Sequence, residues 1–236
     1  MARYLIEFRF QSKKIRRYLE EVIYEINKKF KVGRRKHIPH VTLIGPLETT
    51  QEKRLISDFA RVCSQTKLMK LRCNGFGTFD SNRVVKADIS ASEGLNEFRT
   101  KLVEILRSYC KLQQQDKKKD IDKFGYHSTL AMNLNEKEFN LIKAHIKNKS
   151  PPNFTQIIMR VTLLRNGKIL SEYDFIQRRL FNRRQALNKH ILIRSKTLLK
   201  EFMQGRYNPN NRLIIKPTIK KESFIAKIKK FFGLKW

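Results

Sequence analysis

The hydrophobic positions of the first 80 residues predict strands and helices in alternation. Apolar residues dominate the stretch 3–10, which is typical of a strand, and they recur at helical spacing over residues 12–30. Thr49 and Glu52 predict a capping box at the start of a second helix. The expected elements are a strand at 3–10, a helix at 12–30, a strand at 40–47, a helix from 49 and strands at 68–73 and 75–79.

The same order of elements recurs between residues 83 and 176. Asn135 and Glu138 predict another capping box, and Asn166 with Gly167 forms a two-residue turn between apolar runs, which predicts a closing hairpin. The expected elements are a strand at 83–90, a helix from Ser92 to Tyr109, a polar loop at 113–120, a strand at 127–134, a helix from 135 and hairpin strands at 155–164 and 168–176.

Both series follow the order β-α-β-α-β, and each has the tetrapeptide His-x-Thr-Leu on its middle strand. This correspondence indicates an internal duplication of about 80 residues, based on element order and motif and not on residue identity. We therefore expect an α+β, bilobal unit over residues 1–180, with lobes at about 1–80 and 81–180 around a central cleft. Residues 181–236 are expected to form a basic, partly helical C-terminal extension.

The duplicated motif puts histidine and threonine side chains on one face of each strand. Side chains alternate along a strand, so His40 shares a face with Thr42, and His127 with Thr129. If a two-fold axis relates the lobes, two imidazoles and two hydroxyls converge on one cavity. One imidazole can act as base and the other as acid near neutral pH, because the unperturbed pKa of histidine is about 6.5. The hydroxyls can donate hydrogen bonds to phosphoryl oxygens.

With these motifs the chain resembles the 2H phosphoesterase superfamily, named for its two His-x-Thr/Ser-x motifs, and in particular its archaeal and bacterial 2′-5′ RNA ligase-like branch. The matching segments are PHVTLIGP, GFGTF, YHSTL and EYDFIQRRLFNRRQAL, within residues 1 to about 190. The resemblance implies a duplicated bilobal fold and metal-independent chemistry, without a cofactor, on 2′,3′-cyclic phosphates or 2′-5′ linkages of RNA. By motif position it implies that His40, Thr42, His127 and Thr129 are the catalytic set.

Four further residues are candidates for contacts with the substrate. Tyr126 and Phe79 can stack on a base, or they are ordinary core aromatics. Arg83 and Lys86, on the strand that opens the second half, can reach a phosphate, or they belong to a solvated edge.

The charge of the chain makes a polyanion the expected partner, and RNA fits this expectation. Lysine and arginine outnumber the acids by 52 to 21, for a net charge of +31, although general basicity of the organism's proteome is an alternative. Residues 178–236 contain 17 Lys and Arg against two acids, and a helix is expected at 187–202, ended by Gly205. The terminal segment 223–236 predicts a cationic amphipathic helix, which docks on the catalytic unit, extends the RNA-binding surface or lies on an anionic membrane surface.

The cysteines and the hydropathy pattern indicate the compartment. Cys63, Cys73 and Cys110 lack the spacing of a zinc or redox site, so we expect reduced core thiols, a cytoplasmic protein and no metal. No secretory leader opens the chain, and no apolar run approaches the roughly 18 residues of a membrane span, so no segment is expected to cross a bilayer. We also expect a monomer.

The expected function is RNA end processing by a phosphoesterase that opens 2′,3′-cyclic phosphates, and the same site can make or break 2′-5′ linkages. Two alternatives are open: a non-catalytic RNA-binding protein on the same scaffold, and a phosphodiesterase for small cyclic nucleotides. RNA affinity without turnover is the sign of the first alternative. An enclosed cleft in place of an open basic groove is the sign of the second.

Overall fold

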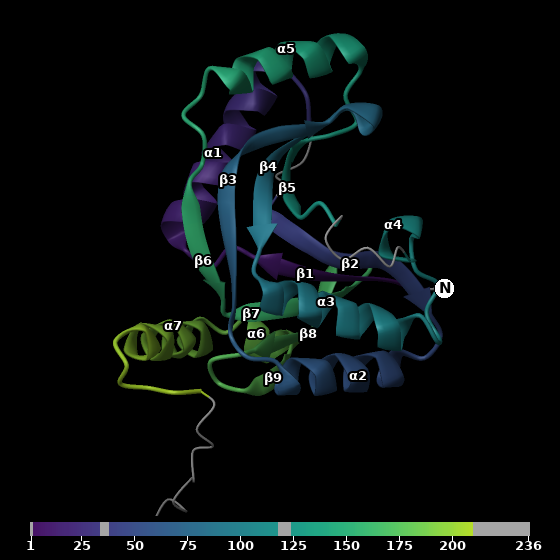
Figure 1. Ribbon diagram of the computed structural model, residues 1–236, viewed down its shortest axis with the longest axis vertical. Coiled ribbons are helices and arrows are strands. Elements are labelled where there is room, and N and C mark those ends of the chain that lie inside the picture. Colours follow the sequence, from purple (N-terminus) through teal and green to yellow (C-terminus); the bar gives the residue numbers. More distant parts are fainter. Residues whose placement is uncertain (1, 34–37, 118–123, 210–236) are drawn as a thin grey trace, which may run out of the picture.

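Two antiparallel sheets form the framework of the computed structural model, which describes residues 2–33, 38–117 and 124–209 (Figure 1). The strands are β1 (Ala2–Arg9), β2 (His40–Thr49), β3 (Met69–Phe79), β4 (Val84–Ala91), β5 (His127–Ala131), β6 (Phe154–Ile158), β7 (Arg160–Arg165), β8 (Lys168–Asp174) and β9 (Arg179–Asn182). The helices are α1 (Lys13–Phe30), α2 (Glu52–Gln65), α3 (Glu93–Leu106), α4 (Gln114–Lys117), α5 (Glu136–Lys147), α6 (Arg183–Ala186) and α7 (Lys189–Met203), and a 3₁₀ helix spans Asp80–Asn82. The predicted α+β class is confirmed.

Each sheet contains strands from both halves of the chain. The strand order is β2-β1-β7-β8-β9 in the first sheet and β5-β4-β3-β6 in the second. β3 thus belongs to the second sheet although it ends before residue 80, and β7, β8 and β9 return to the first sheet. The expected lobes at 1–80 and 81–180 therefore do not coincide with the two sheets.

The chain crosses between the sheets at Met159, inside a segment that was predicted as one strand. β6 pairs with β3 in the second sheet, whereas β7 pairs with β1 in the first sheet. Met159 itself is buried. No glycine or proline interrupts residues 155–164, so the segment contains no turn signal at the change of sheet. The predicted hairpin is confirmed, because β7 pairs with β8 and both Asn166 and Gly167 have positive φ, as this kind of turn requires.

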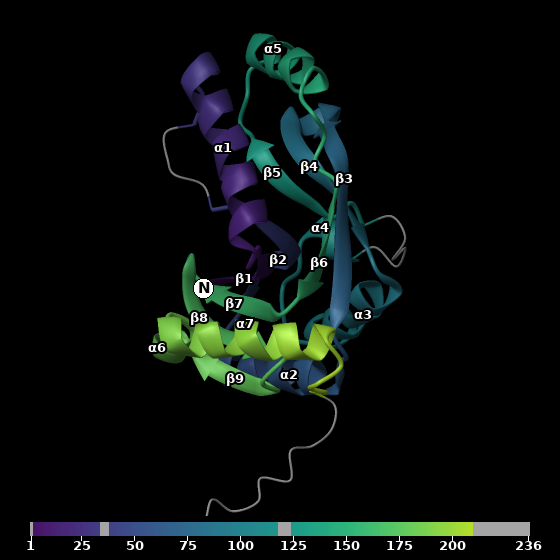
Figure 2. The same cartoon turned by 90° about the vertical axis from the view of Figure 1, so that its left-hand side faces the viewer.

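The helices cover the sheets and join them through one continuous core. α1 contacts β5 and α5, and α3 contacts α2, β2 and β3 (Figures 1 and 2). The buried side chains of both sheets and of these helices form a single hydrophobic cluster. The face that α1 buries is the one that the helical spacing predicted: Leu19, Val22, Ile23 and Ile26.

Two predicted helix starts have different outcomes. The capping box of α5 is confirmed, because Asn135 accepts from the amide of Glu138 and the Glu138 carboxylate accepts from the amide of Asn135. The predicted box at Thr49 and Glu52 is wrong. Thr49 is the last residue of β2, and its hydroxyl donates to the carbonyl of Tyr109 and accepts from the amide of Gln51. Since the strand fixes Thr49, α2 begins without a side-chain cap.

The predicted helix near 187–202 is α7, and Gly205 follows it with a φ of +71°. The amphipathic segment 223–236 lies outside the described residues. Among the described helices, none is long and apolar enough to cross a membrane. The thiols of Cys63, Cys73 and Cys110 are buried and form no disulfide, as expected for core residues.

Candidate functional site

The two His-x-Thr motifs form the starts of β2 and β5, and each of these strands lies at the edge of its sheet. The two strands contact each other (Figure 1). Side chains alternate along both as predicted. The histidine and threonine of each motif are half-buried, whereas the residues between and after them are buried in the core: Val41 and Leu43 in β2, Ser128 and Leu130 in β5. The motif residues therefore share the side of each strand that faces away from the core.

The same backbone hydrogen bond orients both imidazoles. Nδ1 of His40 lies 2.9 Å from the carbonyl oxygen of Ile38, and Nδ1 of His127 lies 2.7 Å from that of Gly125. A carbonyl oxygen only accepts, so each Nδ1 must donate its hydrogen. In the neutral ring Nε2 is then the basic nitrogen. The two motifs thus present the same ring atom for proton transfer.

Burial and the charges around the second motif, including that of His40, act on the pKa of His127. Burial lowers the pKa of His127, and its hydrogen bond to Gly125 opposes this shift. The charges of Lys86 and His40 lower the pKa further, and Asp88 raises it. His127 is therefore held toward its neutral form, in which Nε2 can accept a proton.

An ion pair on β1 accompanies the first motif. Arg9 is the cross-strand neighbour of His40, Glu7 is the neighbour of Thr42, and the two charged side chains pair with each other. The buried Glu7 carboxylate also lies 3.9 Å from Nε2 of His40. An acid is therefore placed where it can pair with a protonated His40 ring.

A second ion pair, on β4, accompanies the second motif. Asp88 is the cross-strand neighbour of His127, Lys86 is the neighbour of Thr129, and Lys86 pairs with Asp88. The Asp88 carboxylate occupies the space above Gly77 of β3, where a Cβ would overlap it. Because glycine has no Cβ, Gly77 leaves room for the Asp88 carboxylate.

Sequence reasoning missed Glu7, Arg9 and Asp88. Each belongs to a pair of opposite charges two residues apart within an apolar strand, in the segments EFR and KAD. Burying two charges on one face of such a strand costs free energy unless they form an ion pair. The pattern therefore could have predicted the two ion pairs from the sequence.

The four weaker candidates have different positions. Phe79 packs edge-to-face against His127, with ring centroids 4.8 Å apart, and the ammonium of Lys86 lies 4.6 Å from the Phe79 centroid. Both residues are thus at the site. Arg83 lies in the left-handed turn before β4, with a φ of +49°, and not on the strand as expected. Tyr126 is buried in the core, where its ring meets Phe124, and so it lies on the other side of the strand from His127.

A buried ion pair links β2 to the segment that precedes β5. Arg99 pairs with Asp116 at 2.6 Å, and Nε of Arg99 donates to the carbonyl of Leu43 at 2.9 Å. Asp116 also accepts from the amide of Gly45 at 2.9 Å. The guanidinium lies 3.6 Å from the ring centroid of Phe124. This network therefore contacts β2 at Leu43 and Gly45, and it contacts the segment before β5 at Phe124.

The adjoining edge strands and their matched motifs define the class of two-histidine phosphoesterases. Residues 12–168, more than half of the chain, match the family model of the 2′-5′ RNA ligase superfamily, and the chain belongs to that family. A search of curated proteins found none that matches the chain.

Solved structures have the same fold. A protein described as a phosphoesterase superposes with a TM-score of 0.52 and 19% identity, over 73% of this chain and 97% of its own. LigT of E. coli in its apo form superposes with a TM-score of 0.51 and 18% identity, over 73% of this chain and 96% of its own. LigT has also been solved with 3′-AMP, at a TM-score of 0.47 and 16% identity, over 73% of this chain and 97% of its own.

Proposed function

We propose that the chain is an RNA end-processing phosphoesterase that opens 2′,3′-cyclic phosphates without a metal ion, and that the same site can make or break 2′-5′ linkages. The observation that supports this proposal is the matched pair of imidazoles. Both Nδ1 atoms donate to a carbonyl two residues earlier, and the charge of His40 is one of those that lower the pKa of His127. Two histidines placed in this way supply both proton transfers that phosphoester hydrolysis requires.

We propose a role for each ring in ring opening from the charged groups near it. His127, held neutral by burial and by Lys86, takes a proton from the attacking water. The protonated form of His40, which the carboxylate of Glu7 can pair with, gives a proton to the leaving ribose oxygen. The bond from water oxygen to phosphorus forms as the bond from phosphorus to the ribose oxygen breaks, and solvent exchange restores both rings. In ligation the roles reverse, because the steps run backwards.

The remaining groups bind the phosphoryl oxygens and attract the substrate. The hydroxyls of Thr42 and Thr129 donate to the non-bridging oxygens, where charge grows in the transition state. Lys86 contributes a positive charge beside His127. The net charge of +31 raises the local concentration of RNA and makes its binding dependent on salt.

The test is turnover of an RNA oligonucleotide that ends in a 2′,3′-cyclic phosphate, in excess EDTA. Single-turnover rates are compared for the intact protein, His40→Ala, His127→Ala and, as a matched control, His190→Ala, which changes an exposed histidine of α7. We expect both motif variants to lose at least a hundredfold in rate, because general acid or base catalysis contributes about 10²–10⁴. The control should keep the parent rate. An intact protein that binds this RNA tightly and does not open the ring would instead be a binding protein on this scaffold.

A further inference from the structure

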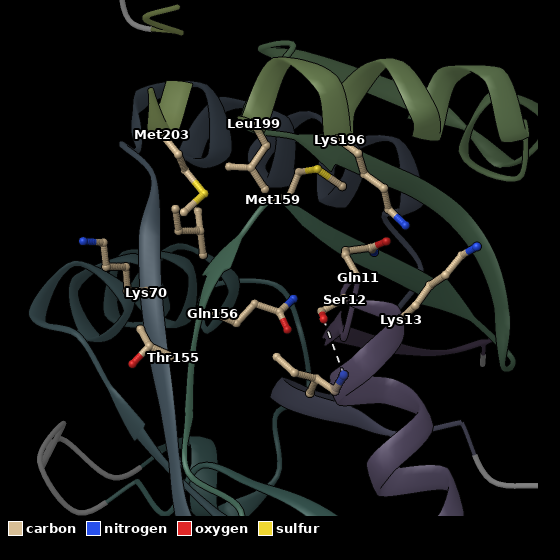
Figure 3. Close-up of a pocket in the computed structure, with 12 residues that line it drawn as sticks. Gln11, Ser12, Lys13, Lys70, Thr155, Gln156, Met159, Lys196, Leu199 and Met203 are labelled. Atoms are coloured by element: carbon tan, nitrogen blue, oxygen red, sulfur yellow. Dashed lines mark hydrogen bonds between the residues drawn. The ribbon is translucent and has the colours of Figure 1, made fainter. Parts of the chain in front are cut away.

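A second cavity, of about 640 Å³, lies between the start of α1, the strands β3 and β6, and the helix α7 (Figure 3). None of its lining residues belongs to β2 or β5, so it is distinct from the site of the two histidines. α7 lies outside residues 12–168, the part of the chain that matches the family model. The volume is within the range of about 300–1,000 Å³ that is typical of small-molecule sites.

One end of the cavity is strongly cationic. Lys13 begins α1, where the helix dipole is positive, and Lys196 of α7 extends toward the same place (Figure 3). Lys70 lies at the opposite end. None of the described residues that line the cavity is an acid, and α1 has no acidic residue in its first turn. This end of the cavity therefore favours an anion.

A buried hydrogen-bond network holds α7, the helix that carries Lys196, against the first sheet. Ser195, next to Lys196, is buried and receives a hydrogen bond from Arg160, which also pairs with Glu172 and Asp174. This network ties α7 to β7 and β8. Burial lowers the pKa of Lys196, and the nearby charges of Lys13, Arg16 and Arg160 lower it further. An anion beside Lys196 would relieve this repulsion.

A buried amide in the cavity lacks a hydrogen-bond partner. Gln156 of β6 is 9% exposed, and its Oε1 has no partner among the described residues. Figure 3 shows its side chain pointing into the cavity, toward Gln11 and Ser12. A buried carbonyl oxygen without a partner costs free energy, and a hydroxyl or N–H of a ligand would satisfy it.

The lining also has an apolar part, formed by Ile15, Ile157, Met159, Leu199 and Met203. Met159 and Leu199 form one wall, and Met203 lies at its exposed end. Methionine adapts its shape and packs well against aromatic rings. The cavity thus combines an anion-binding end, a hydrogen-bond acceptor and a surface suited to a flat ring.

We propose that this cavity binds a nucleoside phosphate, with the phosphate at Lys13, Lys196 and the start of α1, a sugar hydroxyl or base N–H on Gln156, and the base against Met159 and Leu199. The nucleoside phosphate is either a free mononucleotide or the phosphorylated end of an RNA chain. This site goes beyond the proposed reaction, because it shares no lining residue with the motif strands.

The test uses the full chain with ¹³C-labelled methionine methyl groups, titrated with 5′-AMP and followed by NMR. Met159 and Met203 line the cavity, whereas Met132 directly follows β5 and reports on the motif strand. We expect the two cavity methyls to shift on titration. Lys13→Gln with Lys196→Gln should then raise the Kd read from these methyls at least tenfold.

The matched control is Lys14→Gln with Lys200→Gln, which removes the same charge from exposed positions on the same two helices. It should change the Kd less than twofold, and both lysine pairs should keep the parent melting temperature. A comparison of 5′-AMP with a 5′-phosphorylated trinucleotide identifies the source by the tighter binding. The proposal is overturned if the cavity methyls do not move, or if the cavity pair raises the Kd no more than the control pair does.

Discussion

Replacing Arg99 by methionine should destabilise the fold by about 3–5 kcal/mol, because it leaves a buried carboxylate without its counter-charge. Both partners are buried in the native protein, with Arg99 3% exposed and Asp116 fully enclosed. After the substitution, Asp116 keeps the hydrogen bond from the amide of Gly45. The carbonyl of Leu43 loses its hydrogen bond, and the ring of Phe124 loses its cation.

A double-mutant cycle in urea tests this reasoning through a change of sign. In the parent, Asp116→Asn should destabilise, since it leaves the guanidinium of Arg99 buried and unpaired. In the Arg99→Met background the same change removes an unpaired buried charge, so it should stabilise. The control Arg107→Met changes an exposed arginine at the end of α3 and should cost less than about 0.5 kcal/mol. A cost below about 1 kcal/mol for Arg99→Met, or the same effect of Asp116→Asn in both backgrounds, would refute the argument.

Three further predictions concern the site. Lys86→Met removes a charge that lowers the pKa of His127, so NMR titration should show this pKa rising, and the rising limb of kcat/KM should move to higher pH by a similar amount. Gly77→Ala should displace the Asp88 carboxylate and lower the pKa of His127, since Asp88 raises it, with a fall in kcat of several fold. Tyr126→Phe should leave KM within twofold and change the unfolding free energy by less than about 1 kcal/mol, because the buried hydroxyl has no hydrogen-bond partner among the described residues.

Local sequence patterns predicted the features that depend on local physics. The alternation of side chains predicted that His40 and His127 lie on the side of their strands that faces away from the core. Helical spacing predicted the buried face of α1. Asn135 capped its helix as predicted, since a capping box needs only residues within one turn. Each of these features is decided by neighbours that are close in the sequence.

Long-range pairing decided what the sequence did not predict. β3 was expected in the first lobe, but it belongs to the second sheet because its hydrogen-bonding partners are β4 and β6. Asp116 lies in a segment predicted as a polar loop, and yet it is buried, because Arg99, 17 residues earlier on α3, provides its counter-charge. The composition of a segment gives its average solvation and does not identify a single charge that a distant residue will bury.

The two ion pairs beside the motifs differ in the order of their charges, so the two histidines of the duplicated motif have different surroundings. The residue opposite the threonine is Glu7 in one half and Lys86 in the other, so the order of charges is inverted. In each pair this residue is the more buried one: Glu7 is 3% exposed against 26% for Arg9, and Lys86 is 11% exposed against 38% for Asp88. Buried charges are screened less by water and salt than exposed charges are. A carboxylate therefore lies near Nε2 of His40, whereas a positive charge lowers the pKa of His127, so the two rings have opposite electrostatic neighbours.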